Sequence, residues 1–378
     1  MTNYGNSEPN GLVLRILGIR GVPAAHGGFE TFAEALSLHL VTRGWKVIVY
    51  CQEDEGTEIW RDDWRGVVRI HIPVRQTGTL GTVIFDWKAT RHAAKHRDCC
   101  LTLGYNTAAF TSLLRLNRLP NLINMDGIEW SRAKWGRIAK LWFWLNDWAG
   151  CWLASHLIAD HPEIKRHLCT RVRETKIDTI AYGAERVLDI SSDPLREWDL
   201  HPKKFLTLIA RAEPENSILE VVRGFSKKRR GVQLVVLGRY DKSHTYQMKV
   251  LEAASDEVKF VGALYDKSVV QALRFHCLAY VHGHRAGGTN PSLVEALGAG
   301  NAIIAHDNVF NRWVAGDSAA YFTDENSFAS LLDKLLADRQ LISDMQSGSV
   351  ERFTEGFTWE RILEQYEVLL SRFANDCR

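Results

Sequence analysis

The sequence of 378 residues lacks the features that mark membrane-spanning, secreted or metal-binding proteins. No apolar run is long enough for a clean transmembrane helix, and residues 1–11 are polar, without the apolar core of a signal peptide. The seven cysteines form no Cys-x-x-Cys pair and no Cys/His spacing of a zinc site. We therefore expect reduced, buried thiols in a cytoplasmic protein, with residues 1–11 as a flexible tail.

The chain also lacks a large excess of positive or negative charge. The formal net charge is only +2, which gives no global attraction to nucleic acid, so we predict no nucleic-acid partner. There is no internal repeat and no low-complexity segment. Hydrophobic residues at 46% and charged residues at 24% are ordinary for a soluble globular protein, and the length favours two domains.

Short apolar runs alternate with helical patterns through the chain, which predicts an α/β fold with two doubly wound parallel sheets. Residues 53–65 are acidic and predict a loop, and residues 106–116 predict one helix. The polar stretch 182–201 predicts the connection between two domains. The expected strands span residues 13–19, 46–51, 67–72, 100–103, 122–125, 157–160 and 176–180, then 205–210, 232–237, 258–261, 277–281, 302–305 and 319–322.

Residues 280–305 have the pattern strand, glycine-rich loop, short helix, strand. Asn290 is a good N-cap and Pro291 suits the first helical position, so the helix would offer free amides and a positive dipole end to an anion. Glu295 lies one turn inside this helix, where a carboxylate can meet hydroxyls beside that anion. An ordinary βαβ crossover without a ligand is the alternative, and the His, Arg and Asn residues of the loop favour a binding site.

A second glycine loop follows the first expected strand. Gly27 and Gly28 allow the backbone to approach a ligand closely, and the helix after them offers its N-terminal amides to phosphate. The spacing is not Gly-x-Gly-x-x-Gly, because Pro23 follows Gly18 and Gly21, and this argues against a dinucleotide site. The alternative is a turn that binds nothing.

Charged side chains follow two further strands. Asp126 and Glu129 come after residues 122–125, where ligands of open α/β sheets gather, and are candidates for acid/base chemistry or sugar binding. Asp126 alternatively caps a turn. Arg211 follows another strand and is expected at the same sheet edge as the 280s loop, where both could hold one diphosphate. Its alternative is a surface ion pair with Glu213.

Residues 131–152 are the most aromatic part of the chain, since six of the thirteen tryptophans lie from Trp130 to Trp152. Apolar residues recur at helical spacing in two neighbouring stripes, one through Ile138 and Leu145 and one through Leu141 and Trp148. Basic residues beside tryptophan suit an anionic membrane surface, and a broad core helix with a solvated basic end is the alternative. The basic residues are Arg132, Lys134, Arg137 and Lys140.

Four motifs together resemble the retaining glycosyltransferases of family 4, and more narrowly its bacterial rhamnosyltransferase-like group. They are Gly-Gly-Phe-Glu-Thr at 27–31, Asp-Gly-Ile-Glu-Trp at 126–130 with Lys-Trp-Gly at 134–136, Arg-Ala-Glu-Pro-Glu-Asn at 211–216, and the loop and helix of residues 282–296.

The resemblance implies a GT-B fold: two Rossmann-like domains facing across a cleft, with a C-terminal helix that returns to the first domain. It also implies a nucleotide-sugar donor on the second domain and an acceptor on the first. The expected domains are an acceptor domain at 12–185, a linker at 186–202, a donor domain at 203–356 and the returning helix at 357–378.

The resemblance also implies residue roles. Glu295 matches the glutamate that binds the donor ribose, and Arg211 matches the diphosphate-binding arginine. Asp126 and Arg211 are the expected catalytic residues, and Glu30 and Glu129 are expected on the acceptor side. The remaining expected donor contacts are Gly27, Gly28, Gly262, Leu264, His284, Gly288, Thr289, Asn290, Pro291, Ser292 and Leu293, with Gly262 and Leu264 meeting the base through their backbone.

Three positions depart from the wider family. Gly287 stands where a second glutamate is usual, Asn216 where a lysine is usual, and Asp126 where many members have a sugar-contacting histidine. These changes alter the expected donor-sugar contacts and the neutralisation of the diphosphate. We expect side chains of the 280s loop to substitute: His284, Arg285 and Asn290.

The resulting prediction is a retaining transferase that takes deoxythymidine-diphosphate (dTDP) rhamnose and acts on a saccharide or lipid-linked saccharide in bacterial surface polysaccharide synthesis. We expect no cofactor and no metal, because the chain has no Asp-x-Asp pair. Peripheral attachment to the inner face of the cell membrane is also predicted. The alternatives are a non-catalytic GT-B subunit of a polysaccharide assembly complex and an NAD-dependent oxidoreductase.

Overall fold

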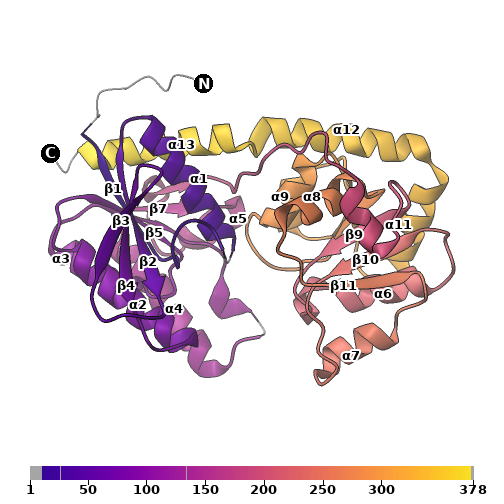
Figure 1. The fold of residues 1–378 in the computed structure, drawn as a ribbon, viewed down its shortest axis with the longest axis horizontal. Coiled ribbons are helices and arrows are strands. Elements are labelled where there is room, and N and C mark those ends of the chain that lie inside the picture. Colours follow the sequence, from indigo (N-terminus) through magenta and orange to yellow (C-terminus); the bar gives the residue numbers. More distant parts are fainter. Residues whose placement is uncertain (1–10, 26, 133, 376–378) are drawn as a thin grey trace. The chain divides into compact units, whose positions relative to one another are not determined.

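The computed structural model describes residues 11–25, 27–132 and 134–375, so most of the predicted tail at 1–11 lies outside the described residues (Figure 1). The chain divides into two compact units. The first comprises Met1–Ala181 with Trp359–Arg378, and the second comprises Tyr182–Thr358. No helix in the described parts of the chain is both long and apolar enough to cross a membrane.

The first unit is built on an eight-stranded sheet with the order β3-β4-β2-β1-β5-β6-β7-β8. All its pairings are parallel except that of β3 with β4, and the predicted strands are confirmed within a few residues. The strands are β1 (Val13–Leu17), β2 (Lys46–Glu53), β3 (Trp60–Trp64), β4 (Val67–Pro73), β5 (Cys99–Leu103), β6 (Asn121–Asn124), β7 (His156–Ala159) and β8 (Ile177–Thr179).

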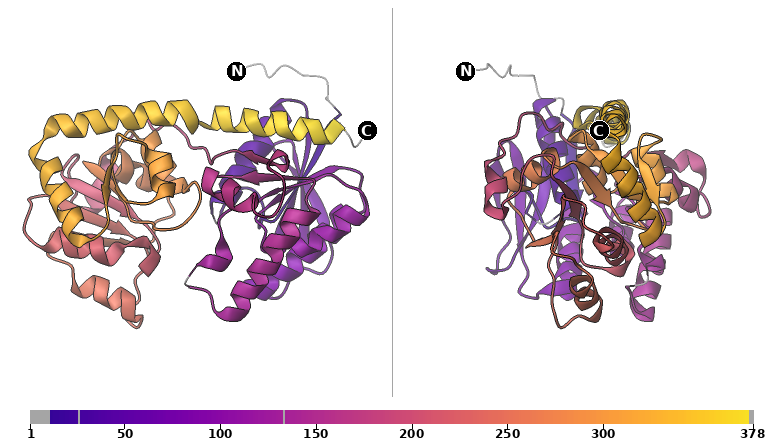
Figure 2. Two further views of the ribbon diagram at one scale, coloured as in Figure 1. Left: turned by 180° about the vertical axis from the view of Figure 1, so that it is seen from behind. Right: turned by 90° about the vertical axis from the view of Figure 1, so that its right-hand side faces the viewer.

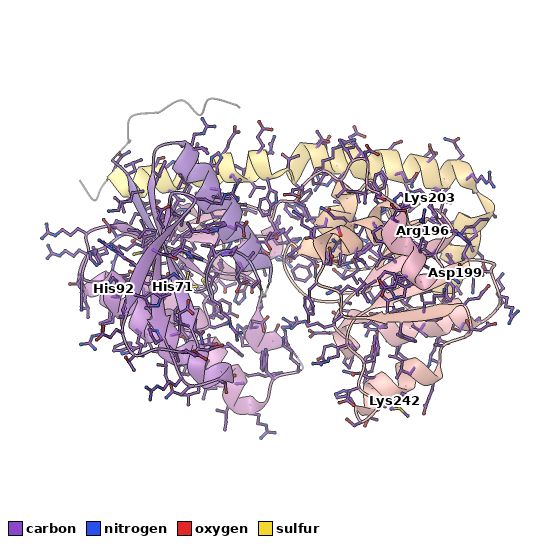
Figure 3. The ribbon with its side chains drawn as sticks, viewed as in Figure 1. His71, His92, Arg196, Asp199, Lys203 and Lys242 are labelled. Carbon is purple, nitrogen blue, oxygen red and sulfur yellow. The ribbon has the colours of Figure 1, made fainter. Side chains whose placement is uncertain are left out.

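Strand β3 corrects the expectation of a loop over residues 53–65. It pairs antiparallel with β4 at the sheet edge, and Asp62 binds both Arg69 and His71 of that neighbour. The Trp60 ring stacks on the imidazole of His71 with 3.6 Å between centroids. His71 is labelled in Figure 3. Side-chain pairs across the strands therefore hold a segment whose own sequence is mostly polar.

Helices cover both faces of the first sheet, and the C-terminal helix α13 (Trp359–Ala374) belongs to this unit. The ring of Phe32 packs 4.5 Å from that of Tyr366, whose hydroxyl accepts a hydrogen bond from Asn124 Nδ2 at 2.8 Å. The expected helix at 106–116 is instead a 3-10 turn, η1 (Ala108–Thr111), followed by a short α-helix. The other helices are α1 (Gly28–Thr42), α2 (Gly78–Ala93), α3 (Ser112–Leu116), α4 (Arg137–Leu153) and α5 (Pro162–Leu168), with η2 (Glu129–Ser131) and η3 (Glu174–Lys176).

The second unit has a six-stranded sheet with the order β11-β10-β9-β12-β13-β14, and every pairing in it is parallel (Figure 2). Its strands are β9 (Phe205–Ile209), β10 (Gln233–Leu237), β11 (Val258–Gly262), β12 (Ala279–His282), β13 (Ala302–His306) and β14 (Ala320–Phe322). Its helices are α6 (Ile218–Ser226), α7 (Thr245–Glu252), α8 (Lys267–Phe275), α9 (Pro291–Gly298), α10 (Val309–Ala315), α11 (Glu325–Ala337) and α12 (Arg339–Gly356), with η4 (Asp193–Trp198) and η5 (Pro214–Asn216). The predicted α/β fold with two parallel sheets is thus confirmed.

Residues 186–202, expected as a linker, pack onto the second unit. The Val187 amide donates to the Gly298 carbonyl at 3.0 Å, and the His276 ring contacts the Ile190 carbonyl at 2.8 Å. Leu195 and Leu200 are both buried. The sequence pattern missed this because two buried leucines in a polar stretch give little periodic signal.

Candidate functional site

The carboxyl edge of the second sheet carries the predicted loop and helix. Asn290 Oδ1 accepts a hydrogen bond from the Ser292 amide at 3.0 Å, and Pro291 is the first residue of α9, so the predicted cap is confirmed. Thr289 and Leu293 are buried on either side of this start. The first turn of α9 therefore directs backbone N–H groups toward the sheet edge, where an anion is stabilised.

The loop after β9 packs directly against the loop after β12. A Cβ atom on Gly283 would lie 2.1 Å from the Asn216 carbonyl oxygen, so only glycine allows this approach. The Arg285 amide donates to the Glu215 carbonyl at 2.9 Å, and Asn216 Nδ2 donates to the Arg211 carbonyl at 2.8 Å. These contacts bring the loop that carries Arg211 beside the 280s loop, as the sequence predicts.

Arg211 itself is exposed, and it forms no salt bridge with Glu213 or with any other residue that the structure describes. A second cation lies on the neighbouring loop. Gly238, with φ of +147°, sits where a Cβ would be 2.6 Å from the Ala210 carbonyl oxygen, which places Arg239 close to the start of the Arg211 loop. Arg239 is also exposed and has no salt bridge within the described chain, and no sequence motif marks it.

Glu295 is held by an arginine of the preceding helix, α8. Arg274 of α8 directs Nη2 at Glu295 Oε2, and the same nitrogen lies 3.3 Å from Ser292 Oγ. Only 9% of the Arg274 side chain is exposed, compared with 35% of the Glu295 side chain. Arg274 therefore fixes the carboxylate from beneath while leaving part of it open to solvent. No local motif marks Arg274, because it lies two elements earlier in the chain.

Two histidines stack behind the 280s loop. The rings of His282 and His284 lie 4.3 Å apart with 12° between their planes. His282 is buried, and neither of its ring nitrogens has a hydrogen-bond partner among the described residues. Burial, and secondarily the nearby His284, hold the pKa of His282 well below its usual value, so this ring is neutral near pH 7.

The side chains expected to replace the usual glutamate and lysine are His284, Arg285 and Asn290, and most of them are bound to other groups. Arg285 Nε donates to Ser217 Oγ at 2.7 Å and Nη2 to Glu220 Oε1 at 2.5 Å, so Arg285 joins the loop to α6. Asn290 serves as the helix cap, and the His284 carbonyl accepts from the Asn308 side chain at 3.0 Å. The structure therefore favours a structural role for Arg285.

Two predicted glycines border open space. Gly287 has φ of +145°, and a Cβ there would meet nothing within 4 Å, so no other group fills the place of the usual glutamate. Gly262 ends β11 with φ of +78°, and its carbonyl accepts from the Gly238 amide at 2.9 Å. Leu264 is half-buried, and the next residue, Tyr265, is 89% exposed. Gly288 is half-buried in the same loop as Gly287.

In the first unit, Asp126 follows β6 in a left-handed backbone conformation with φ of +38°. Its amide donates to Asn124 Oδ1 at 3.0 Å, which holds this uncommon geometry. Burial, and then the charge of Glu129, raise the pKa of Asp126 from 3.8 to about 6. A carboxyl group that changes charge near pH 6 at the carboxyl edge of a sheet suits acid/base or sugar-binding chemistry.

Glu129 is tied into its own loop. One carboxylate oxygen contacts Arg132, and the other accepts from Trp135 Nε1 at 2.9 Å with Lys134 Nζ at 3.8 Å. The Glu129 amide donates to Tyr105 Oη at 2.7 Å. Glu129 thus organises residues 129–135, and an acceptor contact for it stays a prediction.

The glycine loop after β1 leads into α1, which begins at Gly28. The Gly27 carbonyl accepts from the Thr31 amide and hydroxyl, each at 3.2 Å, and Glu34 Oε2 accepts from the Ala24 amide at 2.7 Å. Glu30 is half-buried in the first turn. The loop is held at both ends, and the first amides of α1 lie beside Gly27.

Within the described residues, no group of three or more His, Cys, Asp or Glu side chains is placed to hold a metal ion.

Comparison with protein families gives two matches. Residues 13–185 match a family described as "Domain of unknown function (DUF1972)", and residues 196–351 match "Glycosyl transferases group 1". The second unit is a group 1 glycosyltransferase domain. No curated protein matches the sequence.

Solved structures of glycosyltransferases share the fold of the whole chain. Sucrose-phosphate synthase from Thermosynechococcus elongatus is 18% identical with a TM-score of 0.77, covering 96% of this chain and 98% of its own. Anabaena Alr3699/HepE in complex with UDP and glucose is 14% identical with a TM-score of 0.73, covering 95% and 99%. An α,α-trehalose-phosphate synthase from Burkholderia xenovorans in complex with glucose-6-phosphate is 13% identical with a TM-score of 0.70, covering 96% and 100%. The predicted GT-B fold is confirmed.

Within the glycosyltransferase domain, the structure brings together Arg211, the start of α9 and the Gly262 end of β11 along one sheet edge. It adds Arg239 and Arg274, which no motif indicated. Asp126, Gly27 and Gly28 lie at the corresponding edge of the DUF1972 unit.

Proposed function

We propose that the chain transfers a sugar, for which rhamnose is the best match, from a dTDP-linked donor to a saccharide or lipid-linked saccharide acceptor. The reaction proceeds with retention of anomeric configuration and serves bacterial surface polysaccharide synthesis. The proposed location is the cytoplasm, with peripheral attachment to the inner face of the cell membrane. The observation that carries the proposal is the sheet edge of the group 1 domain, where the loop that bears Arg211 packs against the loop that leads into α9 and Glu295.

In this proposal the second unit binds the donor. Arg211 and the first amides of α9 offset the charge of the diphosphate, and Glu295, braced by Arg274, accepts hydrogen bonds from ribose hydroxyls. The backbone of Gly262 and Leu264 borders the base. The structure of Anabaena Alr3699/HepE with UDP and glucose supports a nucleotide-diphosphate site in this fold. The open space at Gly287 leaves room for a sugar face different from the usual one.

The proposed chemistry needs no protein nucleophile. The acceptor hydroxyl approaches on the face from which the diphosphate departs, the acceptor O–C1 bond forms as the C1–O bond to the diphosphate breaks, and a diphosphate oxygen takes the hydroxyl proton. Arg211 and the α9 amides stabilise the charge that develops on the leaving group. Asp126 orients the sugar or the acceptor.

The test is a panel of purified nucleotide sugars with the isolated chain and a saccharide acceptor. We expect turnover with dTDP-rhamnose, and the one-bond C1–H1 coupling in the NMR spectrum of the product reports its anomeric configuration. A panel in which glucose or N-acetylglucosamine donors work and the rhamnose donor does not would overturn the donor assignment. Inverted product would overturn the mechanism.

A non-catalytic GT-B subunit is the second candidate, favoured by one observation. Asn216 replaces the usual lysine and is buried, with its side chain holding the Arg211 carbonyl, so it cannot contribute positive charge. Donor binding without transfer or hydrolysis, across the whole donor panel, would support this candidate. The group 1 domain match gives no support to an oxidoreductase.

A further inference from the structure

Helix α4 of the first unit turns its polar side inward and its apolar side outward. Asn146 and Asp147 are buried, at 1% and 2% exposure, and the helix carries no other acidic residue. Six large apolar side chains face outward with 40% to 87% of their surface exposed. These residues, which we call the α4 face, are Ile138, Leu141, Trp142, Trp144, Leu145 and Trp152. The alternative of a buried core helix is therefore wrong for this stripe.

A buried ionic cluster fixes this orientation. Asp147 Oδ2 lies 2.8 Å from Arg171 Nη2 and 3.0 Å from His167 Nε2, and it accepts from Trp130 Nε1 at 2.8 Å. Rotating α4 to bury its tryptophans would pull the Asp147 carboxylate out of this cluster and leave the buried Arg171 without its partner. Breaking a buried pair in this way is strongly unfavourable, so the apolar face is held outward.

The apolar surface continues onto neighbouring elements. Trp142 Nε1 donates to the Asn106 carbonyl at 2.8 Å, which joins α4 to the segment that leads into η1. The Phe110 ring of η1 meets the Trp87 ring of α2 edge-on, with 5.3 Å between centroids. Trp87 is itself exposed, as is Leu80 two turns earlier on α2. Figure 1 shows α2 and α4 on the same side of the first unit.

Charge on these elements has one sign. Helix α2, residues 106–118 and helix α4 contain only two carboxylates, Asp86 and Asp147, and both are buried. Their outward cations form no salt bridge with any residue in the described part of the chain. The cations are Lys88, whose Nζ also donates to the Pro73 carbonyl at 2.8 Å, Arg91, Arg115, Arg118, Arg137 and the half-buried Lys140. Arg132 and Lys134, which the sequence analysis counted with them, bind Glu129 instead.

We propose that the α4 face rests on the interfacial region of an anionic lipid bilayer, with these cations over the headgroups. Tryptophan-rich apolar surface beside cations, without exposed carboxylates, matches the chemistry of that region. A second copy of the chain fits less well, because a symmetric contact through this face would bring cations against cations with no carboxylate to pair them. The proposal deepens the membrane location given above, yet it rests on the first unit alone and does not require donor chemistry.

The first test is co-sedimentation of the full chain with vesicles of phosphatidylcholine alone and of phosphatidylcholine with one-third phosphatidylglycerol. We expect binding to the anionic vesicles that weakens at high salt. The variant Arg137→Gln/Lys140→Gln should bind about 25-fold more weakly at low salt, since each cation near such a surface contributes about five-fold. The matched control Lys242→Gln/Lys334→Gln removes two exposed cations of the second unit, one of them labelled in Figure 3, and should bind like the unchanged chain.

The second test removes apolar contact. Ile138→Ser/Leu145→Ser/Trp152→Ser should lower vesicle binding by about ten-fold or more, because exposed side chains that enter the interface lose their apolar area. Its control, Leu188→Ser/Val309→Ser, changes exposed residues of the second unit and should have no effect.

Several results would overturn the proposal. They are equal binding of all variants, no binding of the unchanged chain to anionic vesicles, or a dimer in analytical ultracentrifugation that only the triple serine variant dissolves. The rise in melting temperature caused by dTDP is measured for each variant and should equal that of the unchanged chain. A chain that binds dTDP but no vesicle fails only this proposal, and a chain that binds vesicles but no nucleotide fails only the donor proposal.

Discussion

Replacing Glu295 with alanine separates donor binding from fold stability, because the carboxylate has two partners of different kinds. One is the buried Arg274, and the other is the proposed ribose. Losing a hydrogen bond to a charged group costs about 1.5–3 kcal/mol, so donor affinity should fall by about ten- to one-hundred-fold. We expect this loss in isothermal titration with dTDP and with the sugar nucleotide.

The stability cost follows from the exposure of the pair. Truncating one partner of a fully buried pair costs about 3–5 kcal/mol, but the Glu295 side chain is 35% exposed and water can reach the vacated position. A cost of about 1–2 kcal/mol is therefore expected, which lowers the melting temperature of a domain of this size by about 2–8 °C.

A double variant distinguishes the two roles. Glu295→Ala/Arg274→Met removes the stranded cation, so it should regain stability while donor affinity stays low. The control Lys267→Ala changes a residue of the helix that carries Arg274, breaks only an exposed pair with Glu185 and should change neither quantity. The reasoning is refuted if Glu295→Ala binds donor within about two-fold of the unchanged chain, or if the Arg274 change restores affinity.

The remaining predictions concern Asp126, metal dependence, Gly283 and Arg239. Asp126→Asn should abolish most turnover while leaving donor binding intact, and near-normal turnover would remove Asp126 from the site. Because the folded pKa of Asp126 is raised from 3.8 to about 6, its contribution to stability is present below pH 4 and is lost as the pH rises to 6, and this decline should vanish in Asp126→Asn when unfolding is followed against pH. EDTA should leave turnover unchanged, and recovery by magnesium or manganese after a loss would show that a metal acts. Gly283→Ala should lower stability by more than about 2 kcal/mol and weaken dTDP binding, because its Cβ would strike the adjacent loop, whereas Gly356→Ala has open space and is the control in the same thermal scan. Arg239→Gln should weaken dTDP binding by about ten-fold, and Lys242→Gln, three residues on, should not; equal affinities would exclude Arg239.

Buried parallel strands could be predicted because both faces are covered, so each one is a nearly continuous apolar run. Strand β3 could not be predicted in this way. Its residues include Arg61, Asp62 and Asp63, and its stability comes from Arg69 and His71 on β4. An edge strand held by cross-strand ion pairs and one ring stack has no apolar signature of its own.

For a related reason, the sequence did not determine which face of α4 is buried. Helical spacing identifies which side chains share a stripe, but it does not say whether the stripe faces the core or the solvent. The deciding contacts are those of Asp147 with Arg171 and His167, whose positions depend on the folded chain. The same limit hid Arg274, whose partner Glu295 lies two elements further along the chain. The Asn290 cap, in contrast, was predictable because cap and helix are adjacent in sequence.

Asn216 stands where a lysine is usual in the wider family, and the contacts of its neighbours explain what this residue does. Asn216 is buried, its amide holds the Arg211 carbonyl, and its own carbonyl fits against Gly283, so the position serves to join two loops. A lysine here would have to leave that contact to reach a phosphate. Arg285 cannot supply the missing charge, because Ser217 and Glu220 already hold its guanidinium. Arg239 can, since it is exposed, lacks a salt bridge among the described residues and follows the strand next to that of Arg211. In the proposed donor site, the positive charge for the diphosphate would thus come from a different strand, while Asn216 fixes the geometry of the loop that presents Arg211.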